Sequence, residues 1–183
     1  YVYYGDAAYT NTFTGGMGND RIQSGASTDT YLFNRGDGQD TINDSGGSYS
    51  VVVGTDRIVF GAGSTASDVI VSRVDYNLIV KINDPANLAA TDQITVEDWF
   101  TADQYQIETF QFADGNSVGL TDLQLGTISA ETLTGGAADS VMMGEAGNDI
   151  LNGNEGNDLL NGGLGIDALN GGLGNDTYIV DNT

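Results

Sequence analysis

Aspartates recur every nine residues toward the C-terminal end of the chain, each preceded by glycines at fixed distances. Residues 144–179 form four uninterrupted nine-residue units, with glycine at positions 1 and 4, aspartate at position 6 and an apolar residue at position 8. The position-6 residues are Asp149, Asp158, Asp167 and Asp176. Carboxylates and backbone carbonyls are the donors that Ca2+ takes, and glycines let the backbone turn sharply enough to aim carbonyls at an ion. The spacing therefore predicts repeated calcium binding.

Each unit predicts a glycine-rich turn followed by a strand of about three residues, whose position-8 side chain points inward. The expected inward side chains are Leu151, Leu160, Leu169 and Tyr178. So short a strand is stable only when it stacks on the strands of other units, at a spacing of about 4.8 Å. Stacking brings the position-6 carboxylates into register, and a hard cation between them removes their repulsion.

The same segment resembles the calcium-binding β-roll of the repeat-in-toxin (RTX) family, because its glycines and aspartates are in phase. Two further units, 126–134 and 135–143, extend the phase, so that six units run from 126 to 179. In that family two nonapeptides form one turn of a right-handed parallel roll, which implies that position-6 side chains alternate between two edges. One edge would carry Glu131, Asp149 and Asp167, and the other Ser140, Asp158 and Asp176. We expect a weaker site at Ser140, which lacks a carboxylate.

A second and less regular repeat block lies at residues 6–43. Its units place Asp20, Asp29 and Asp40 at position 6, and a degenerate first unit places Asn11 there. The predicted pairs are Asp20 with Asp40 and Asn11 with Asp29. An amide supplies one oxygen and no charge, so the Asn11 site should be the weaker of the two.

Together the two blocks predict the calcium ligands, which are position-6 carboxylates and glycines of the turns. They are Gly16, Gly18, Asp20, Asp29, Gly36, Gly38, Asp40, Glu131, Gly144, Gly147, Asp149, Gly153, Gly156, Asp158, Gly162, Gly165, Asp167, Gly171, Gly174 and Asp176.

Residues 56–125 lose the nine-residue phase and show longer alternating segments. The segments 69–74 and 78–82 flank a polar turn, which predicts a hairpin. The expected core of this region is Trp99, Phe100, Phe110 and Phe112. The segments 56–61, 77–80, 94–100 and 107–115 resemble, in order and spacing, the haemolysin-type calcium-binding-related domain.

The expected fold is therefore all-β, with a right-handed parallel β-roll in two blocks that flank a small antiparallel β domain. The predicted domains are an N-terminal RTX block at 1–55, the related β domain at 56–125 and a C-terminal RTX block at 126–183.

The composition excludes several functions. Among 183 residues there are 26 acidic and five basic side chains, a net charge of −21, and neither histidine nor cysteine. Such a chain repels nucleic acid and anionic membranes and attracts divalent cations. Serine or cysteine triads, disulfides and histidine or cysteine zinc sites cannot form within it. We expect no catalysis, no nucleic-acid partner and no insertion into a membrane.

The RTX resemblance implies a calcium-binding module that binds several Ca2+ ions and folds on them outside the cell. It would be a monomeric, structural and secretion-coupled part of a larger protein exported by a type I system, and hence secreted. Two alternatives stay open. One is a binding module that recognises a glycan or cell-surface ligand through residues 56–125, with Tyr76 and Tyr105 as exposed aromatics. The other is calcium-dependent self-processing at Asp84-Pro85, a bond that some RTX-type proteins cleave.

Overall fold

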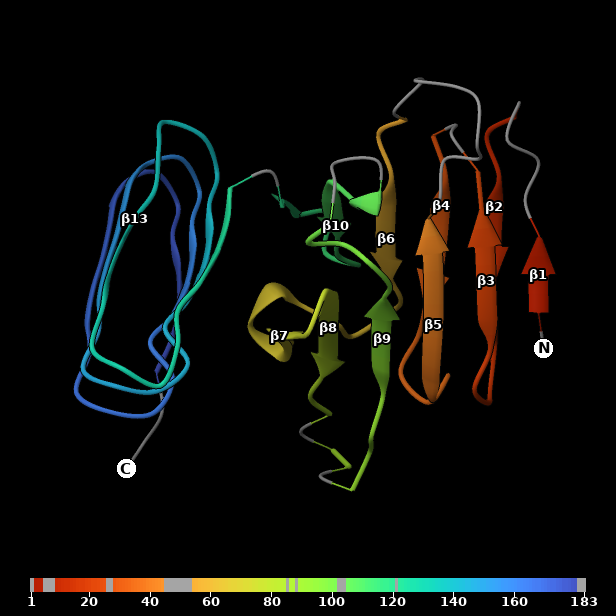
Figure 1. Ribbon diagram of the computed structural model, residues 1–183, viewed down its shortest axis with the longest axis horizontal. Helices are drawn as coiled ribbons and strands as arrows, with labels where there is room; N and C mark the ends of the chain where they lie inside the picture. The colour runs from red at the N-terminus through yellow and green to blue at the C-terminus, as the bar shows by residue number, and fades with distance from the viewer. Residues whose placement is uncertain are drawn as a thin grey trace. The chain divides into compact units, whose positions relative to one another are not determined.

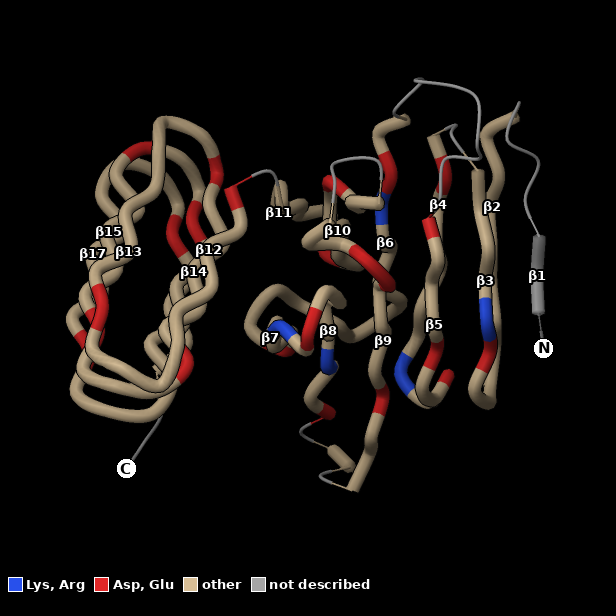
Figure 2. The backbone as a smooth tube through the Cα atoms, in the orientation of Figure 1, with Lys and Arg blue, Asp and Glu red and all other residues tan. Residues whose placement is uncertain are grey.

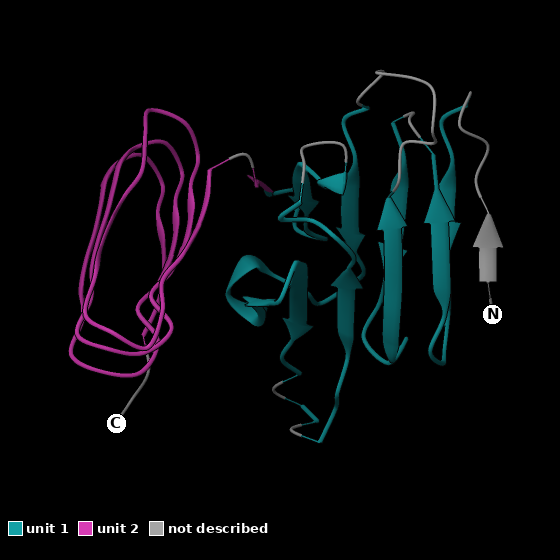
Figure 3. Cartoon of the chain, in the orientation of Figure 1, with its two compact units in different colours: residues 1–117 teal, residues 118–183 magenta. Residues whose placement is uncertain are grey.

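The computed structural model describes residues 2–4, 9–25, 28–44, 54–84, 86–87, 89–101, 105–120 and 122–180. The chain separates into two compact units, Tyr1–Ser117 and Val118–Thr183 (Figure 3). The described residues form an all-β structure without an α-helix, and η1 (Ala66–Asp68) is a short 3-10 turn. None of their helices has the length and apolar character of a membrane span.

Unit 2 consists of two parallel sheets built from stacked loops (Figure 1). One sheet contains β12 (Leu123–Leu125), β14 (Val141–Met143), β16 (Leu159–Asn161) and β18 (Thr177–Ile179), in that order. The other contains β13 (Thr132–Thr134), β15 (Ile150–Glu155) and β17 (Ala168–Leu173). Paired residues are separated by two nonapeptides, as in Leu133 with Leu151 and Leu151 with Leu169. This register confirms the predicted parallel stacking.

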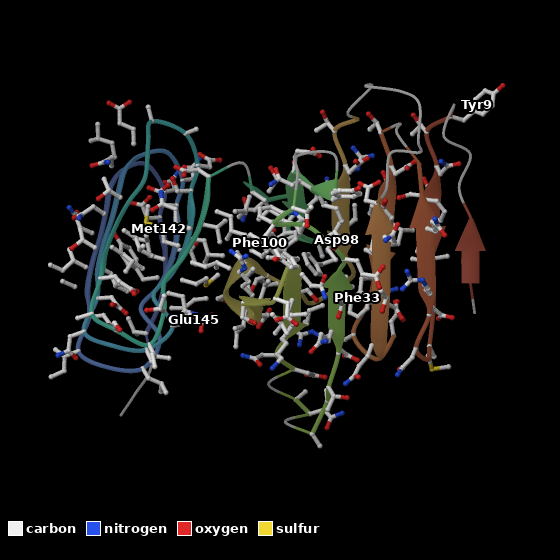
Figure 4. The ribbon with its side chains drawn as sticks, viewed as in Figure 1. Tyr9, Phe33, Asp98, Phe100, Met142 and Glu145 are labelled. Carbon is white, nitrogen blue, oxygen red and sulfur yellow. The ribbon has the colours of Figure 1, made fainter. Side chains whose placement is uncertain are left out.

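The core of unit 2 is the column of position-8 side chains between its sheets. Met142, Leu151 and Leu160 are fully buried, and Leu133 and Leu169 pack against them. Figure 4 shows Met142 inside the stacked loops. Tyr178 occupies the same position beside Leu160, but its side chain is 46% exposed because β18 is an edge strand of its sheet. The inward prediction is thus confirmed fully for Leu151 and Leu160.

Unit 1 contains two larger sheets. The first has the order β1 (Val2–Tyr4), β3 (Arg21–Ser24), β5 (Gln39–Asp44), β9 (Gln93–Val96), β8 (Asn77–Ile82) and β7 (Val69–Val74). The second has the order β11 (Ser117–Gly119, at the boundary between the units), β10 (Thr109–Gln111), β6 (Arg57–Phe60), β4 (Thr30–Phe33) and β2 (Thr12–Thr14). The predicted hairpin is confirmed, since β7 and β8 pair antiparallel across a turn at Asp75 and Tyr76.

The parallel pairing of the first repeat block continues into residues 56–125. Strand β6 pairs parallel with β4, β9 with β5, and β10 with β6. Antiparallel pairing in this region joins β7 to β8 and β8 to β9. The three-domain division stays a prediction, but the strands show that the roll does not stop where the nonapeptide phase is lost.

Aromatic side chains fill the interior of unit 1. Phe60 packs edge-on against Phe110, with ring centroids 5.3 Å apart, and stacks on Phe112 at 5.2 Å. Trp99 is buried as well, whereas Phe100 is half-buried beneath the guanidinium of Arg73 at 4.4 Å. The predicted core is confirmed for three of its four residues.

Candidate metal sites

Position-6 carboxylates form a regular hydrogen-bond ladder along both edges of unit 2. One carboxylate oxygen of each accepts a hydrogen bond from the backbone N–H of the position-6 residue two units earlier. On one edge Asp149 accepts from Glu131 at 2.8 Å and Asp167 accepts from Asp149 at 2.9 Å. On the other, Asp158 accepts from Ser140 at 2.8 Å and Asp176 from Asp158 at 3.1 Å. The two predicted edges are confirmed, and Figure 2 shows acidic residues on both sides of the stacked loops.

The second carboxylate oxygen of these aspartates is available for a ligand. Asp149 and Asp158 are each 1% exposed, and the Oδ2 atom of each has no hydrogen-bond partner among the described residues. Burial raises the pKa of Asp158, because the charged form loses its hydration. A buried carboxylate oxygen without a partner is unfavourable unless a cation or proton meets it, so these residues fit calcium.

Glycine at position 1 leaves the space beside each carboxylate open. A Cβ atom on Gly144 would lie 2.6 Å from Asp149 Oδ2 and 2.5 Å from the carbonyl oxygen of Gly162. A Cβ atom on Gly153 would lie even closer to Asp158 Oδ2. The space around the carboxylate is thus bordered by backbone carbonyls, which are the other donors that Ca2+ takes. At position 4, Gly147 has a φ of 136°, a conformation that only glycine adopts readily.

The ladder in unit 1 begins as predicted. Asp40 accepts from the backbone N–H of Asp20 at 3.0 Å, and Asp29 accepts from that of Asn11 at 2.8 Å. The Asn11 side chain also donates to Asp29, at 2.9 Å. Burial raises the pKa of Asp40 to about 6.

The ladder then extends beyond the repeat block, through residues that the sequence analysis missed. Asp56 accepts from the backbone N–H of Asp29 at 2.5 Å, and Glu108 accepts from that of Asp56 at 2.5 Å. Asp92 accepts from the backbone N–H groups of Gly36 at 2.7 Å and Gly38 at 3.1 Å. Each of these three acids directly precedes a strand, as the position-6 residues do except Asp40, which lies within β5. That placement is the signal that could have identified them.

Asp122 extends the C-terminal ladder by one unit, which corrects the predicted start of the phase. It lies nine residues before Glu131 and directly before β12. Its carboxylate accepts from Ser140 Oγ at 2.8 Å and from the backbone N–H of Gly136 at 3.1 Å. Burial opposes its charge, but these hydrogen bonds and one from Gln124 outweigh it and lower the pKa of Asp122. Ser140 stands at position 6, where the other units of the C-terminal block have an acid, and its hydroxyl donates to the carboxylate of Asp122.

Within the described ranges, no group of three or more acidic side chains is arranged so that it could hold a metal ion by itself. A cation here would be held by one or two carboxylates together with backbone carbonyls of the turns. Glu131 differs from the aspartates, because its carboxylate accepts from the backbone N–H of Thr127 in its own turn at 2.7 Å. The metal roles of the predicted residues stay predictions, whereas their alignment in two edges is observed.

Two family models match the chain. The RTX calcium-binding nonapeptide repeat matches residues 7–42, 125–160 and 152–181, just over half of the sequence. The haemolysin-type calcium binding protein related domain matches residues 77–122. No curated protein matches the chain significantly. Both matches agree with the resemblances drawn from the residues.

Proposed function

Since the chain belongs to the RTX calcium-binding nonapeptide-repeat family, we propose that its Ca2+-binding repeats make it a structural module that folds on calcium outside the cell. The module would be part of a larger protein exported by a type I system. Calcium near millimolar concentration, the range that extracellular modules use, would order it after export. RTX repeats are generally structural and calcium-binding, and no catalytic role is proposed for this chain.

The buried, unpartnered Oδ2 atoms of Asp149 and Asp158 carry this proposal. Each lies in register with the next position-6 carboxylate of its own edge, Asp149 with Asp167 and Asp158 with Asp176, beside strands too short to be stable alone. The whole chain carries a net charge of −21. Without a cation, the repulsion between these carboxylates opposes the compact state. When Ca2+ binds only the folded form, its binding free energy becomes folding free energy.

Circular dichroism of the chain in chelator and in about 1–10 mM Ca2+ tests the coupling. We expect little β structure in chelator and a cooperative gain with calcium, together with about four to seven bound ions by calorimetry. Mg2+ at the same concentration is the control, because it demands a smaller octahedral site and should order the chain poorly. A chain already fully folded in chelator would show that folding is not coupled to calcium.

A polar groove on unit 1 favours a glycan as a second candidate ligand. It has a volume of about 470 Å3 and lies over β3, β5 and β9. Its lining includes Asn19, Arg21, Gln39, Thr41, Gln93 and Thr95. Of the aromatics expected to support binding, Tyr76 is 61% exposed and Tyr105 is half-buried. A glycan array probed with calcium-loaded protein tests this candidate, and the absence of any binding would eliminate it.

The self-processing alternative involves a bond that lies partly outside the described residues, which include Asp84 but not Pro85. The Asp84 carboxylate accepts a hydrogen bond from the backbone N–H of Ala86 at 2.9 Å and lies 3.6 Å from the Arg35 guanidinium. The contact with Arg35 and the hydrogen bond from Ala86 engage the carboxyl group that would have to act on its own peptide bond. Incubation with calcium, followed by electrophoresis for two fragments, tests this alternative.

A further inference from the structure

Asp44 and Ser24 occupy a place in the repeat that glycine holds elsewhere. Each follows a position-6 aspartate by four residues, Asp40 and Asp20 respectively, which is position 1 of the next unit. In unit 2 a side chain at this position would point at the next position-6 carboxylate, as a Cβ on Gly144 would at Asp149. The carboxyl of Asp44 and the hydroxyl of Ser24 are thus directed into the turn where the other repeats leave space.

Asp44 meets Asp56 inside unit 1. Their carboxyl groups approach within hydrogen-bonding range of each other, and Asp29 acts on both as a further negative charge. All three are at least 96% buried: Asp29 is 0%, Asp44 2% and Asp56 4% exposed. Asp29 and Asp56 are joined in addition by the ladder hydrogen bond of 2.5 Å.

The two carboxylate oxygens of Asp44 differ in their hydrogen bonding. Oδ1 accepts a hydrogen bond from Ser24 Oγ at 2.8 Å, and Ser24 in turn contacts the hydroxyl of Tyr31, which is 1% exposed. Oδ2 is buried and has no hydrogen-bond partner in the described part of the chain. Ser24 and Tyr31 therefore fix the orientation of a carboxylate that interacts with other acids. Two buried carboxylates that meet require a positive partner.

The geometry points to a calcium site in which Asp44 Oδ2 and the Asp56 carboxylate are ligands, with Ser24 and Tyr31 as positioning residues. The site rests on the proposed function, but neither family model includes Asp44 or Asp56 in the residues it matches. A divalent cation is favoured over a shared proton because it offsets the charges of both carboxylates next to Asp29, whereas one proton neutralises a single carboxyl. All of its side-chain donors are oxygens, which suits Ca2+.

Ion counting on the full chain tests this site. Calorimetry and elemental analysis of the wild type and Asp44→Asn at saturating calcium should show one Ca2+ fewer per chain in the variant. Asp75→Asn, which makes the same charge change in an exposed turn, should bind the wild-type number. Equal counts for wild type and Asp44→Asn would overturn the site. A wild type that binds no calcium would instead refute the proposed function.

Terbium luminescence gives a second readout that does not depend on the fold of Asp44→Asn. Tb3+ bound here would be sensitised by Tyr31, which reaches Asp44 through Ser24. Tyr31→Phe should keep the wild-type ion count and lose part of the tyrosine-excited emission. Ser24→Ala should keep the count but bind the ion of this site at least several-fold more weakly. Unchanged emission in Tyr31→Phe would show that no ion lies near this turn.

Discussion

The two carboxylate oxygens of a position-6 aspartate such as Asp149 or Asp158 have different roles. Oδ1 closes the ladder by accepting a backbone N–H, while Oδ2 stays within the turn. An amide at this position keeps an oxygen for the ladder but loses the charge and half of the donors. Substitutions to asparagine therefore separate the alignment of the strands from the binding of the cation.

We predict that Asp158→Asn raises the calcium concentration at the folding midpoint about tenfold, which corresponds to ~1.4 kcal/mol. Its amide oxygen can still accept the N–H of Ser140, so the change reports the lost charge beside the ion. Calcium titrations followed by circular dichroism measure the midpoint, with Asp75→Asn as the control for an exposed acid. If the midpoint stayed at the wild-type value, the Asp158 carboxylate would not be a ligand.

Glycine at position 1 is a steric requirement of the turn. We predict that Gly144→Ala lowers the free energy of unfolding in calcium by about 1–3 kcal/mol, because its methyl group would overlap the Asp149 carboxylate and a backbone carbonyl. Gly136→Ala is the matched control: its Cβ would meet no atom closer than Asp122 Oδ2, at 3.7 Å. Urea unfolding of both variants measures the difference, and equal losses would contradict the steric explanation.

The strands differ in how far they could be predicted from the sequence. In unit 2 every ladder hydrogen bond spans 18 residues, so counting in nines finds both the strands and their carboxylates. In unit 1 the ladder steps from Asp29 to Asp56 and from Asp56 to Glu108 span 27 and 52 residues. Insertions of that length erase the period while leaving the stacking intact. The parallel role of β6, β9 and β10 was therefore not evident from the nine-residue period.

Asp122 is a different case, because the signal was present. The residue is in phase with Glu131, but the unit around it lacks the glycines that mark the other turns. Its carboxylate instead accepts side-chain hydrogen bonds from Ser140 and Gln124. The nine-residue phase of the acid was a better guide than the glycine pattern.

Several acids of the molecule are buried, among them Asp40 and Asp44, which makes its calcium-free state sensitive to pH. Burial raises the folded-state pKa of Asp40 to about 6, and burial together with Asp56 raises that of Asp44 to about 9, both above the ordinary value of 3.8. A folded state that binds protons more tightly than the unfolded state is stabilised at low pH. This contribution is complete below about pH 4 and is lost as the pH rises through 6 and then toward 9.

We therefore predict that dialysed, calcium-free protein gains β structure when the pH falls from about 8 to about 5. Acidification also lowers the net negative charge of the chain, and the weaker repulsion likewise favours the folded state. Calcium-loaded protein should vary much less over this range, because the cation takes the place of the protons. Circular dichroism against pH in both states measures the effect. A calcium-free chain that lost β structure on acidification would contradict the sign derived from Asp40 and Asp44.

The two units differ in the regularity of their sites, which predicts an order of folding. Asp149, Asp158, Asp167 and Asp176 follow one another without interruption, whereas the first block includes Asn11 and a two-residue insertion before Arg35. We predict that backbone signals of residues 144–179 become ordered at a lower calcium concentration than those of residues 9–44. Residue-resolved NMR during a calcium titration of the full chain measures both midpoints. Simultaneous ordering of the two blocks would contradict this order.

The ladder of unit 2 also gives the structure a mechanical polarity. Every bond runs from the backbone of one turn to a carboxylate two units later, so each turn is fastened by the turn that follows it. Under tension applied from residue 180, the load falls first on Asp176 and Asp167, and their release unfastens Asp158 and Asp149 in succession. A full turn of 18 residues would lengthen the chain by roughly 60 Å each time it opened. The module would thus extend under force in a series of steps, one turn at a time. Calcium would set its stiffness.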